Sequence, residues 1–303
     1  MSWKLTLPCT KAEAEALNGD LPQLAALDPQ PVLLTSELDD GAAWRLDAYF
    51  EEEPDGHAVM LLRGLVPSAA RAPALVESIE EQDWVTLSQQ GLEPIQAGRF
   101  FVHTPAHRHR IPPNAVPLEI DAGRAFGTGQ HETTTGCLLA LTRLRESGLS
   151  FGNVADIGTG TGLLAFAALR LWPAAKAIAS DIDPVAIEVA AENAAINRVP
   201  IGRARGQLEL AVAPGMECSR LKARAPYDLV IANILAAPLI QLAPSICAAI
   251  EAGGRLILAG LLTNQADAVL AAYRRQGLSL IFAVERGDWP TLTLRKRRAL
   301  GWR

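Results

Sequence analysis

The feature of this 303-residue chain that most constrains its fold is a glycine-rich turn between two apolar segments. Residues 154–157 have the pattern of a short buried strand, residues 158–162 alternate glycine with threonine, and residues 163–171 have apolar side chains at helical spacing. Glycines allow positive φ and let a ligand come close to the backbone. A strand, such a turn and a helix, in this order, are typical of a parallel α/β sheet that binds a nucleotide or a nucleoside.

The spacing of the glycines narrows the class of ligand. A dinucleotide-binding turn has the pattern G-x-G-x-x-G, which requires a glycine at position 163, where this chain has Leu163. The chain also lacks the phosphate-binding pattern G-x-x-x-x-G-K-[ST]. These differences favour a nucleoside ligand that carries no diphosphate.

Two acidic residues stand at the ends of neighbouring predicted strands. Asp156 comes two residues before the first glycine, where its carboxylate is an acceptor near a cationic or amino-bearing ligand. Asp181 ends the next strand, from which a carboxylate reaches the ribose hydroxyls of a nucleoside lying over the strand tips. This combination is typical of the S-adenosyl-L-methionine site of Rossmann-like methyltransferases. The alternative is a turn that satisfies only its own backbone.

The C-terminal part of the chain alternates between strand and helix patterns, which predicts a parallel α/β sheet. The uncharged stretch 229–250 is long enough to span a bilayer, but Pro238 and Pro244 favour a buried strand followed by a helix. We expect the last two strands to pair as an antiparallel hairpin. The seven predicted strands are 154–157, 177–181, 208–212, 228–232, 255–259, 278–284 and 291–294.

The N-terminal part predicts a separate, small α+β domain. We expect a helix within 11–27, a strand beginning over 57–62, and a second helix from Ser68 to about Glu81. Further strands are expected over 3–7, 32–35 and 44–50. The fold class is therefore α/β: a small α+β domain over 1–80, a linker or extension over 81–118, and a Rossmann-like seven-stranded class I methyltransferase domain over 119–303.

Charge is distributed unevenly between these parts. Residues 1–98 carry 5 Lys and Arg against 17 Asp and Glu, a net charge of −12, whereas the remaining residues carry 23 against 16, a net charge of +7. The difference suggests two domains with different partners, and a solvated acidic surface is the alternative. The overall charge of −5 argues against a nucleic-acid binder held by bulk positive charge.

The cysteines and the N-terminal residues indicate the compartment. The four cysteines lie far apart, with no CxxC pair, which fits neither a disulfide framework nor a zinc site. The first residues show neither the apolar core nor the cleavage site of a secretory signal. We therefore expect a cytoplasmic protein with no metal site and no membrane segment.

A second motif, over 123–134, combines three glycines with a cluster of hydroxyl side chains just before the predicted sheet. Its glycines predict a mobile loop that closes over a ligand. Phe126 is placed to cover the adenine face or the methionine chain. Thr133 and Thr134 are placed to cap a helix and to donate hydrogen bonds to the ligand.

A third motif contains Asn233, at the tip of the fourth predicted strand. N-methyltransferases that act on amides or adenine carry Asn or Asp followed by Pro-Pro-aromatic at this place, and this chain keeps only the Asn. Because an aromatic clamp for a flat acceptor is missing, an sp3 amine is the more natural substrate. We interpret Trp84, Trp172 and Trp289 as packing residues rather than ligand-stacking ones.

These motifs together resemble the bacterial methyltransferases of ribosomal protein L-eleven, a family that methylates lysine side chains and α-amines. The resemblance implies S-adenosyl-L-methionine as cofactor and recognition of the ribosomal protein by the N-terminal domain. It also implies cofactor contacts from Thr134, Gly158, Asp181 and Asn233, with Phe126 in the loop over the cofactor. The full set of candidate cofactor-binding residues is Phe126, Gly127, Thr133, Thr134, Asp156, Gly158, Gly160, Asp181 and Asn233.

We therefore expect a cytoplasmic S-adenosyl-L-methionine-dependent protein-lysine N-methyltransferase. Asn233 is the candidate residue for orienting the amine, and no His or carboxylate stands out as a dedicated base. Neither a membrane nor a nucleic-acid substrate is expected as a partner. The alternatives are a lysine methyltransferase of another protein, such as the electron-transfer flavoprotein β subunit, a nucleic-acid methyltransferase, and a non-catalytic nucleoside-binding regulator.

Overall fold

The computed structural model describes residues 2–17, 24, 27, 31–37, 44–50, 52–70, 72–79, 93–120 and 132–297. The chain divides into two compact units, residues 1–88 and residues 89–303. The sequence analysis places the end of the N-terminal domain at residue 80. Residues 80–92, where it expects a linker to begin, lie outside the described part of the chain.

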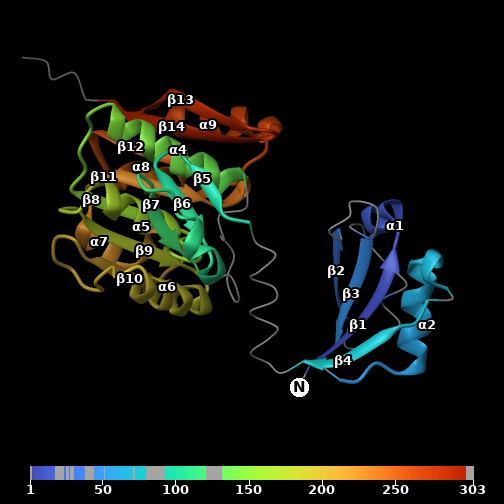
Figure 1. The fold of residues 1–303 in the computed structure, drawn as a ribbon. Helices are drawn as coiled ribbons and strands as arrows, with labels where there is room; N and C mark the ends of the chain where they lie inside the picture. The colour runs from blue at the N-terminus through green and yellow to red at the C-terminus, as the bar shows by residue number, and fades with distance from the viewer. Residues whose placement is uncertain are drawn as a thin grey trace, which may run out of the picture. The chain divides into compact units, whose positions relative to one another are not determined.

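The first unit is an antiparallel four-stranded sheet with helices on one face (Figure 1). Alternate residues of the central strands, such as Leu5 and Leu46, are fully buried because they form one apolar cluster with Leu62 on the helical side. The strand order is β2-β3-β1-β4. In chain order the elements are β1 (Ser2–Cys9), α1 (Lys11–Ala16), β2 (Val32–Glu37), β3 (Trp44–Phe50), α2 (Gly56–Leu65) and β4 (Leu75–Ile79).

Two predictions for this unit are wrong. The segment 57–62, expected to begin a strand, belongs to the helix α2, because the Asp55 side chain caps its first turn by accepting from the N–H of Ala58 at 2.8 Å. The helix expected from Ser68 is instead a short 3-10 turn, Pro67–Ala69, followed by β4. β4 pairs with β1, and this long-range pairing outweighs the local helical preference.

The second unit is built on a seven-stranded sheet in the order β10-β9-β8-β11-β12-β14-β13. The first five of these run parallel, and β14 lies antiparallel between β12 and β13. All seven predicted strands are confirmed, including the terminal hairpin. The strands are β8 (Asn153–Ile157), β9 (Lys176–Asp181), β10 (Leu208–Val212), β11 (Tyr227–Asn233), β12 (Ile250–Ala259), β13 (Leu278–Arg286) and β14 (Trp289–Lys296).

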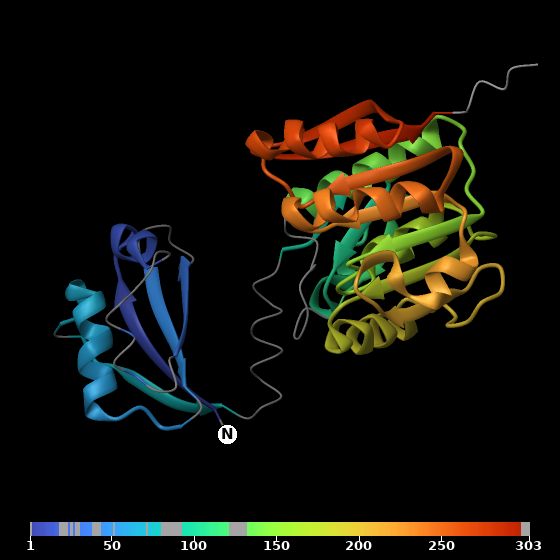
Figure 2. The same ribbon diagram turned by 180° about the vertical axis from the view of Figure 1, so that it is seen from behind.

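Helices cover both faces of this sheet, as the two opposite views show (Figures 1 and 2). Neighbouring strand residues face opposite layers of helices: Val154 packs against one layer, called the first, and Ala155 packs against the other, called the second. Both strand residues are fully buried, so the sheet is the centre of the core. The first layer contains α4 (Glu132–Glu146), α5 (Leu163–Leu171) and α6 (Pro184–Ile196), and the second contains α7 (Ser219–Arg224), α8 (Ala236–Ala249) and α9 (Ala266–Arg275).

The second unit includes residues that the sequence analysis assigns to a linker or extension. β5 (Ile95–Ala97), β6 (Phe100–His103) and β7 (Val116–Glu119) form a small sheet. Phe100 and Leu118 are fully buried in the same cluster as α4 and α5. The Asn197 side chain accepts from the N–H of Glu119 at 3.0 Å and donates to its carbonyl oxygen at 2.6 Å. The compact unit thus begins before residue 119.

The uncharged stretch 229–250 forms most of β11 and all of α8. The prediction of a buried strand followed by a helix is confirmed. No helix among the described residues is long and apolar enough to cross a membrane.

Candidate functional site

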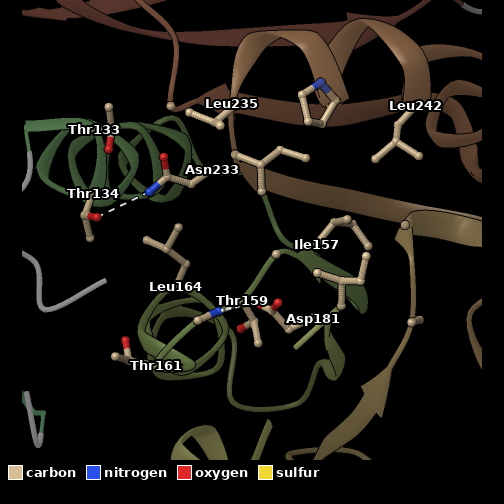
Figure 3. A pocket seen from close by; sticks show the side chains of 18 of the residues that line it. Thr133, Thr134, Ile157, Thr159, Thr161, Leu164, Asp181, Asn233, Leu235 and Leu242 are labelled. Carbon is tan, nitrogen blue, oxygen red and sulfur yellow. Dashed lines mark hydrogen bonds between the residues drawn. The ribbon is translucent and has the colours of Figure 1, made fainter. Parts of the chain in front are cut away.

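A cavity of about 1220 Å³ follows the carboxyl edge of the large sheet (Figure 3). Its walls include residues at or just beyond the ends of five neighbouring parallel strands, together with side chains from α4, α5 and α8 and from the start of β14. In open α/β sheets this edge is where ligands bind, because the loops that leave the strand ends diverge there. The strand-end residues are Gly158, Asp181, Ala213, Asn233 and Gly260.

Glycines shape the floor of this cavity. Gly158, Gly160 and Gly162 have φ values of +70°, +54° and +85°, a region that side chains disfavour. A Cβ atom on Gly158 would stand 2.2 Å from Cγ2 of Ile234, and one on Gly260 would stand 2.4 Å from the carbonyl oxygen of the same Ile234. The ends of β8, β11 and β12 therefore come together only because these two positions have no side chain.

Asp181 faces the cavity and also holds the glycine turn. Its Oδ2 accepts from the N–H of Gly160 at 2.9 Å, and its Oδ1 accepts from the N–H of Asp183 at 3.1 Å. Each carboxylate oxygen has a second lone pair that can accept from a ligand hydroxyl. Asp181 is thus placed both to fix the turn and to bind a ribose.

Asp156 lies beneath the turn and is not one of the cavity-lining residues. It is fully buried, and its Oδ2 accepts from Oγ1 of Thr159 at 2.6 Å and from the N–H of Ala165 at 3.2 Å. Burial raises the pKa of this carboxyl, the two hydrogen bonds oppose the rise, and Asp181 adds to it, so that the pKa reaches about 7. Asp156 holds the glycine turn from beneath. The turn therefore separates its carboxylate from the cavity, and the ligand contact expected from the sequence is not a direct one in this arrangement.

Asn233 and Thr134 meet inside the cavity. The Nδ2 of Asn233 donates to Oγ1 of Thr134 at 3.3 Å (Figure 3). This hydrogen bond uses the side-chain nitrogen of Asn233 and leaves its side-chain oxygen, Oδ1, as an acceptor for a ligand. Thr133 and Thr134 lie inside the first turn of α4, which begins at Glu132, so the prediction that they cap the helix is wrong.

The structure brings most of the predicted site residues together. Phe126 and Gly127 lie outside the described residues, and Asp156 lies beneath the turn. The other six candidates all line the one cavity: Thr133, Thr134, Gly158, Gly160, Asp181 and Asn233.

The helical wall of the cavity is not predicted by any of the sequence motifs. Leu235, Pro238 and Leu242 line it along one flank of α8. Their spacing of three and four residues is that of one helix face, which was a usable signal. The same spacing is also found in helices that only pack against a core, so the pattern alone does not distinguish the two cases.

The tryptophans have different roles. Trp172 is 3% exposed and packs as expected, whereas Trp84 lies outside the described residues. Trp289 lines the cavity at the start of β14, which the packing interpretation did not foresee. It supplies an aromatic surface that the Asn233 motif lacks. Its position depends on β14 lying beside β12, and no local pattern in the sequence reports that pairing.

The composition of the walls limits the chemistry. Among the described residues that line the cavity, Asp181 is the only carboxylate, and there is no His, Cys, Lys or Tyr. No group of three or more His, Cys, Asp or Glu in the described ranges could hold a metal ion. The cavity therefore offers a carboxylate at β9, an amide and a hydroxyl near β11, and largely apolar surfaces elsewhere. This arrangement suits binding and positioning rather than proton transfer by a wall side chain.

We predict that Asp156→Asn changes how the stability of the second unit depends on pH. In the wild type the folded-state pKa of Asp156, about 7, lies above the ordinary value of 3.8, so the contribution of this group to stability is fully present below about pH 4 and is lost as the pH rises through 7. The neutral Asn lacks this fall, which amounts to about 1.4 kcal/mol for each unit of pKa shift. Thermal unfolding from pH 4 to 8 should show the wild type losing stability relative to the variant. A constant difference over this range would contradict the raised pKa.

Comparison with known proteins identifies one family. A family model described as ribosomal protein L11 methyltransferase (PrmA) matches residues 3–297. The chain is 40% identical over 299 residues to the ribosomal protein L11 methyltransferase of Brucella melitensis, covering 96% of this chain and 99% of that protein. The identity to the Agrobacterium fabrum protein of the same name is 39% over 268 residues, covering 87% and 89%.

A solved structure agrees with these relatives. The crystal structure of a ribosomal protein L11 methylase from Lactobacillus delbrueckii subsp. bulgaricus has a TM-score of 0.59 at 25% identity, covering 68% of this chain and 100% of that one. The predicted Rossmann-like class I methyltransferase fold is thereby confirmed. Because the family model spans nearly the whole chain and the relatives match it over almost all of their length, the chain belongs to the ribosomal protein L11 methyltransferase family.

Proposed function

We propose that this protein is an S-adenosyl-L-methionine-dependent N-methyltransferase that methylates lysine side chains of ribosomal protein L11, with its α-amine as a further acceptor. The observation that carries the proposal is that one cavity joins Asp181 at β9 to Asn233 at β11 and Trp289 at β14. A nucleoside cofactor bound at Asp181 leaves room for an amine near Asn233 and Trp289. The named activity of the relatives supports L11 as the substrate.

The residues of the cavity fit S-adenosyl-L-methionine. The Asp181 carboxylate suits ribose hydroxyls, and Gly158 and Gly160 leave the backbone of the turn open to a ligand. Beneath the turn, the buried Asp156 has an Oδ1 without a hydrogen-bond partner among the described residues. Above its pKa of about 7 this carboxyl is negatively charged, and the charge favours a ligand with positive charge on a sulfonium and an amine. When bound, the cofactor supplies an electrophilic methyl group. The motif at 123–134 and the resemblance both place Phe126 in a loop over it, and Gly127 is the candidate beside Phe126 in the same motif.

Asn233 is the residue that we propose to orient the acceptor amine. Its Nδ2 is held by Thr134, so its carbonyl oxygen is available to accept from an amine N–H. An amine that donates one N–H in this way directs its lone pair to another side. Aligning that lone pair with the methyl carbon at near-attack distance is the main contribution that the protein can make to methyl transfer.

The apolar surfaces near Asn233 favour the reactive form of the amine. A lysine in water has a pKa of about 10.4 and must lose its proton before it attacks. Removal from water disfavours the charged form and lowers this pKa. Since no described lining residue near Asn233 is an acid or a base, we propose that the proton leaves to water before the amine is enclosed. Trp289 can then hold the aliphatic stem and, after methylation, the cationic product.

We also propose that the N-terminal unit recognises the ribosomal protein, and that the reaction takes place in the cytoplasm, where ribosomes are assembled. Ribosomal proteins are typically basic because they bind RNA phosphates. Residues 1–98 carry a net charge of −12. Opposite net charges speed association over long range, and dissolved salt screens the attraction.

We predict that Asp181→Ala weakens cofactor binding. Losing hydrogen bonds from ribose hydroxyls to a carboxylate should reduce the binding free energy by about 1.5–3 kcal/mol. Asp181→Asn keeps an acceptor for the N–H of Gly160 and should retain more of the fold of the turn. Isothermal titration with S-adenosyl-L-methionine and S-adenosylhomocysteine measures both variants. An unchanged affinity in the alanine variant would exclude Asp181 from the cofactor site.

We predict that Asn233→Ala separates catalysis from cofactor binding. If Asn233 orients the amine, kcat for methylation of L11 should fall by at least tenfold, roughly the scale of one positioning hydrogen bond, while the Kd of S-adenosylhomocysteine stays within about threefold. Thr134→Val tests the hydrogen bond between Thr134 and Asn233, since it removes the hydroxyl that accepts from the side-chain amide of Asn233. If the Kd rises as much as kcat falls, Asn233 acts through the cofactor and not through the amine.

We predict that kcat/KM on L11 falls as ionic strength rises, whereas the affinity for S-adenosylhomocysteine changes little. The double variant Glu52→Lys, Glu53→Lys reverses two exposed charges of the first unit and should lower kcat/KM and flatten its dependence on salt. The matched control, Glu146→Lys with Glu251→Lys, reverses two exposed charges of the second unit. Equal effects of the two double variants would leave the acidic unit with no special part in recognition.

A further inference from the structure

We propose that Gln241 of α8 recognises the Watson–Crick edge of the cofactor's adenine and so determines the specificity for an adenine nucleoside. This inference rests on the proposed function, because it requires a nucleoside bound with its ribose at Asp181. It concerns a residue that no sequence motif marks and that lies outside the glycine turn, the strand-end carboxylate and the acceptor region.

The order of the strands fixes the side on which the base must lie. β9, which ends at Asp181, stands between β8, which carries the glycine turn, and β10. If the ribose is at Asp181 and the methionine chain lies along the glycine turn, the base must lie toward β10. The N–H of Ala213, just after β10, donates to the carbonyl oxygen of Asp181 at 2.7 Å, so the two strand ends are adjacent. Pro214 and Gly215 continue the cavity wall on this side.

Apolar surfaces dominate this end of the cavity. Ile182, Ala213, Pro214 and Leu242 line it, and none of their side chains can form a hydrogen bond. Such surfaces cover the faces of a purine ring without distinguishing one purine from another. The information that identifies adenine lies on its edge, where N1 is an acceptor and the 6-amino group is a donor.

Gln241 brings hydrogen-bonding groups to this end. Leu242, the next residue, packs closely against Gly215, since a Cβ atom on Gly215 would stand 2.5 Å from Cδ2 of Leu242. This contact fixes the α8 flank over the β10 side of the cavity. Gln241, the neighbour of Leu242 in α8, also lines the cavity, and it is an exposed residue.

The carboxamide matches the adenine edge. It presents an acceptor oxygen and a donor nitrogen in one plane, and Gln and Asn side chains pair in this two-bond manner with N6 and N7 of adenine. On the Watson–Crick edge, N6 and N1 offer the same combination of a donor and an acceptor. The other carboxamide of the wall, Asn233, already donates to Thr134 and lies at β11, beyond the glycine turn. At the β10 side of the cavity, where the base must lie, Gln241 is therefore the described lining side chain that can both accept and donate hydrogen bonds.

A double-mutant cycle between protein and ligand tests the proposal. The two ligands are S-adenosylhomocysteine and its analogue that lacks the 6-amino group, and the two proteins are the full-length wild type and Gln241→Ala. Isothermal titration gives the four Kd values. We expect removal of the amino group to weaken binding to the wild type by roughly three- to tenfold, the effect of one neutral hydrogen bond. In Gln241→Ala the same removal should change the Kd by less than about twofold, because the partner is gone.

Two further variants control the cycle. Gln241→Glu keeps an acceptor for the 6-amino group but places a carboxylate against N1, so it should bind S-adenosylhomocysteine more weakly and still depend on the amino group. Gln276→Ala removes an exposed glutamine at the end of α9, away from the cavity, and should behave as the wild type.

The outcomes distinguish this inference from the proposed function. If the wild type does not bind S-adenosylhomocysteine, the proposed function fails. If it binds, and the 6-amino group contributes equally in the wild type and in Gln241→Ala, the role of Gln241 is overturned while the function stands. If Gln241→Ala changes only KM for L11, Gln241 contacts the protein substrate, and the inference is likewise overturned.

Discussion

The position of Ile234 between two glycines is the constraint on which the rest of the site depends. Gly158 after β8 and Gly260 after β12 both approach Ile234 so closely that neither position has room for a Cβ atom. The ends of three neighbouring strands are thereby locked together, and the residues on either side of Ile234 are set in place. Asn233 reaches Thr134 of α4, and Leu235 starts the flank of α8 that walls the cavity. A side chain at Gly260 would meet the backbone of Ile234 and push the strand ends apart, and one at Gly158 would displace the Ile234 side chain.

The order of the strands arranges the tasks of the site along the sheet edge. Asp181 and the residues after β10 lie on one side of the glycine turn, and Asn233 and Trp289 lie on the other. Among the described residues of the wall Asp181 is the single carboxylate, so the geometry favours binding and alignment over acid–base chemistry. This division suits a group-transfer reaction in which the donor molecule carries a group that is already activated for transfer. The demand on the protein is then to exclude water and to hold two reactants in line.

Much of this arrangement follows from the sequence, because it is written in local patterns. The turn at 158–162, the acids at 156 and 181, and the alternating strands and helices predict the sheet and one side of the cavity. What the sequence did not predict depends on contacts between distant segments. The 57–62 segment is helical because Asp55 caps it, and β4 is a strand because β1 offers it an edge. Trp289 reaches the cavity because β14 pairs with β12.

The place of β14 has a consequence for how the molecule is made. Among the described strands β14 comes last in the chain, yet it lies between β12 and β13, and Trp289 at its start completes the acceptor end of the cavity. Domains generally fold as units, the N-terminal ones first during synthesis. The sheet of the second unit, and with it the acceptor end of the cavity, therefore stays incomplete until β14 has been made. Until β14 has been made, β12 presents an unpaired edge, which is a template for pairing with a neighbouring nascent chain. Truncation before β14 would leave a half-built site attached to an aggregation-prone edge.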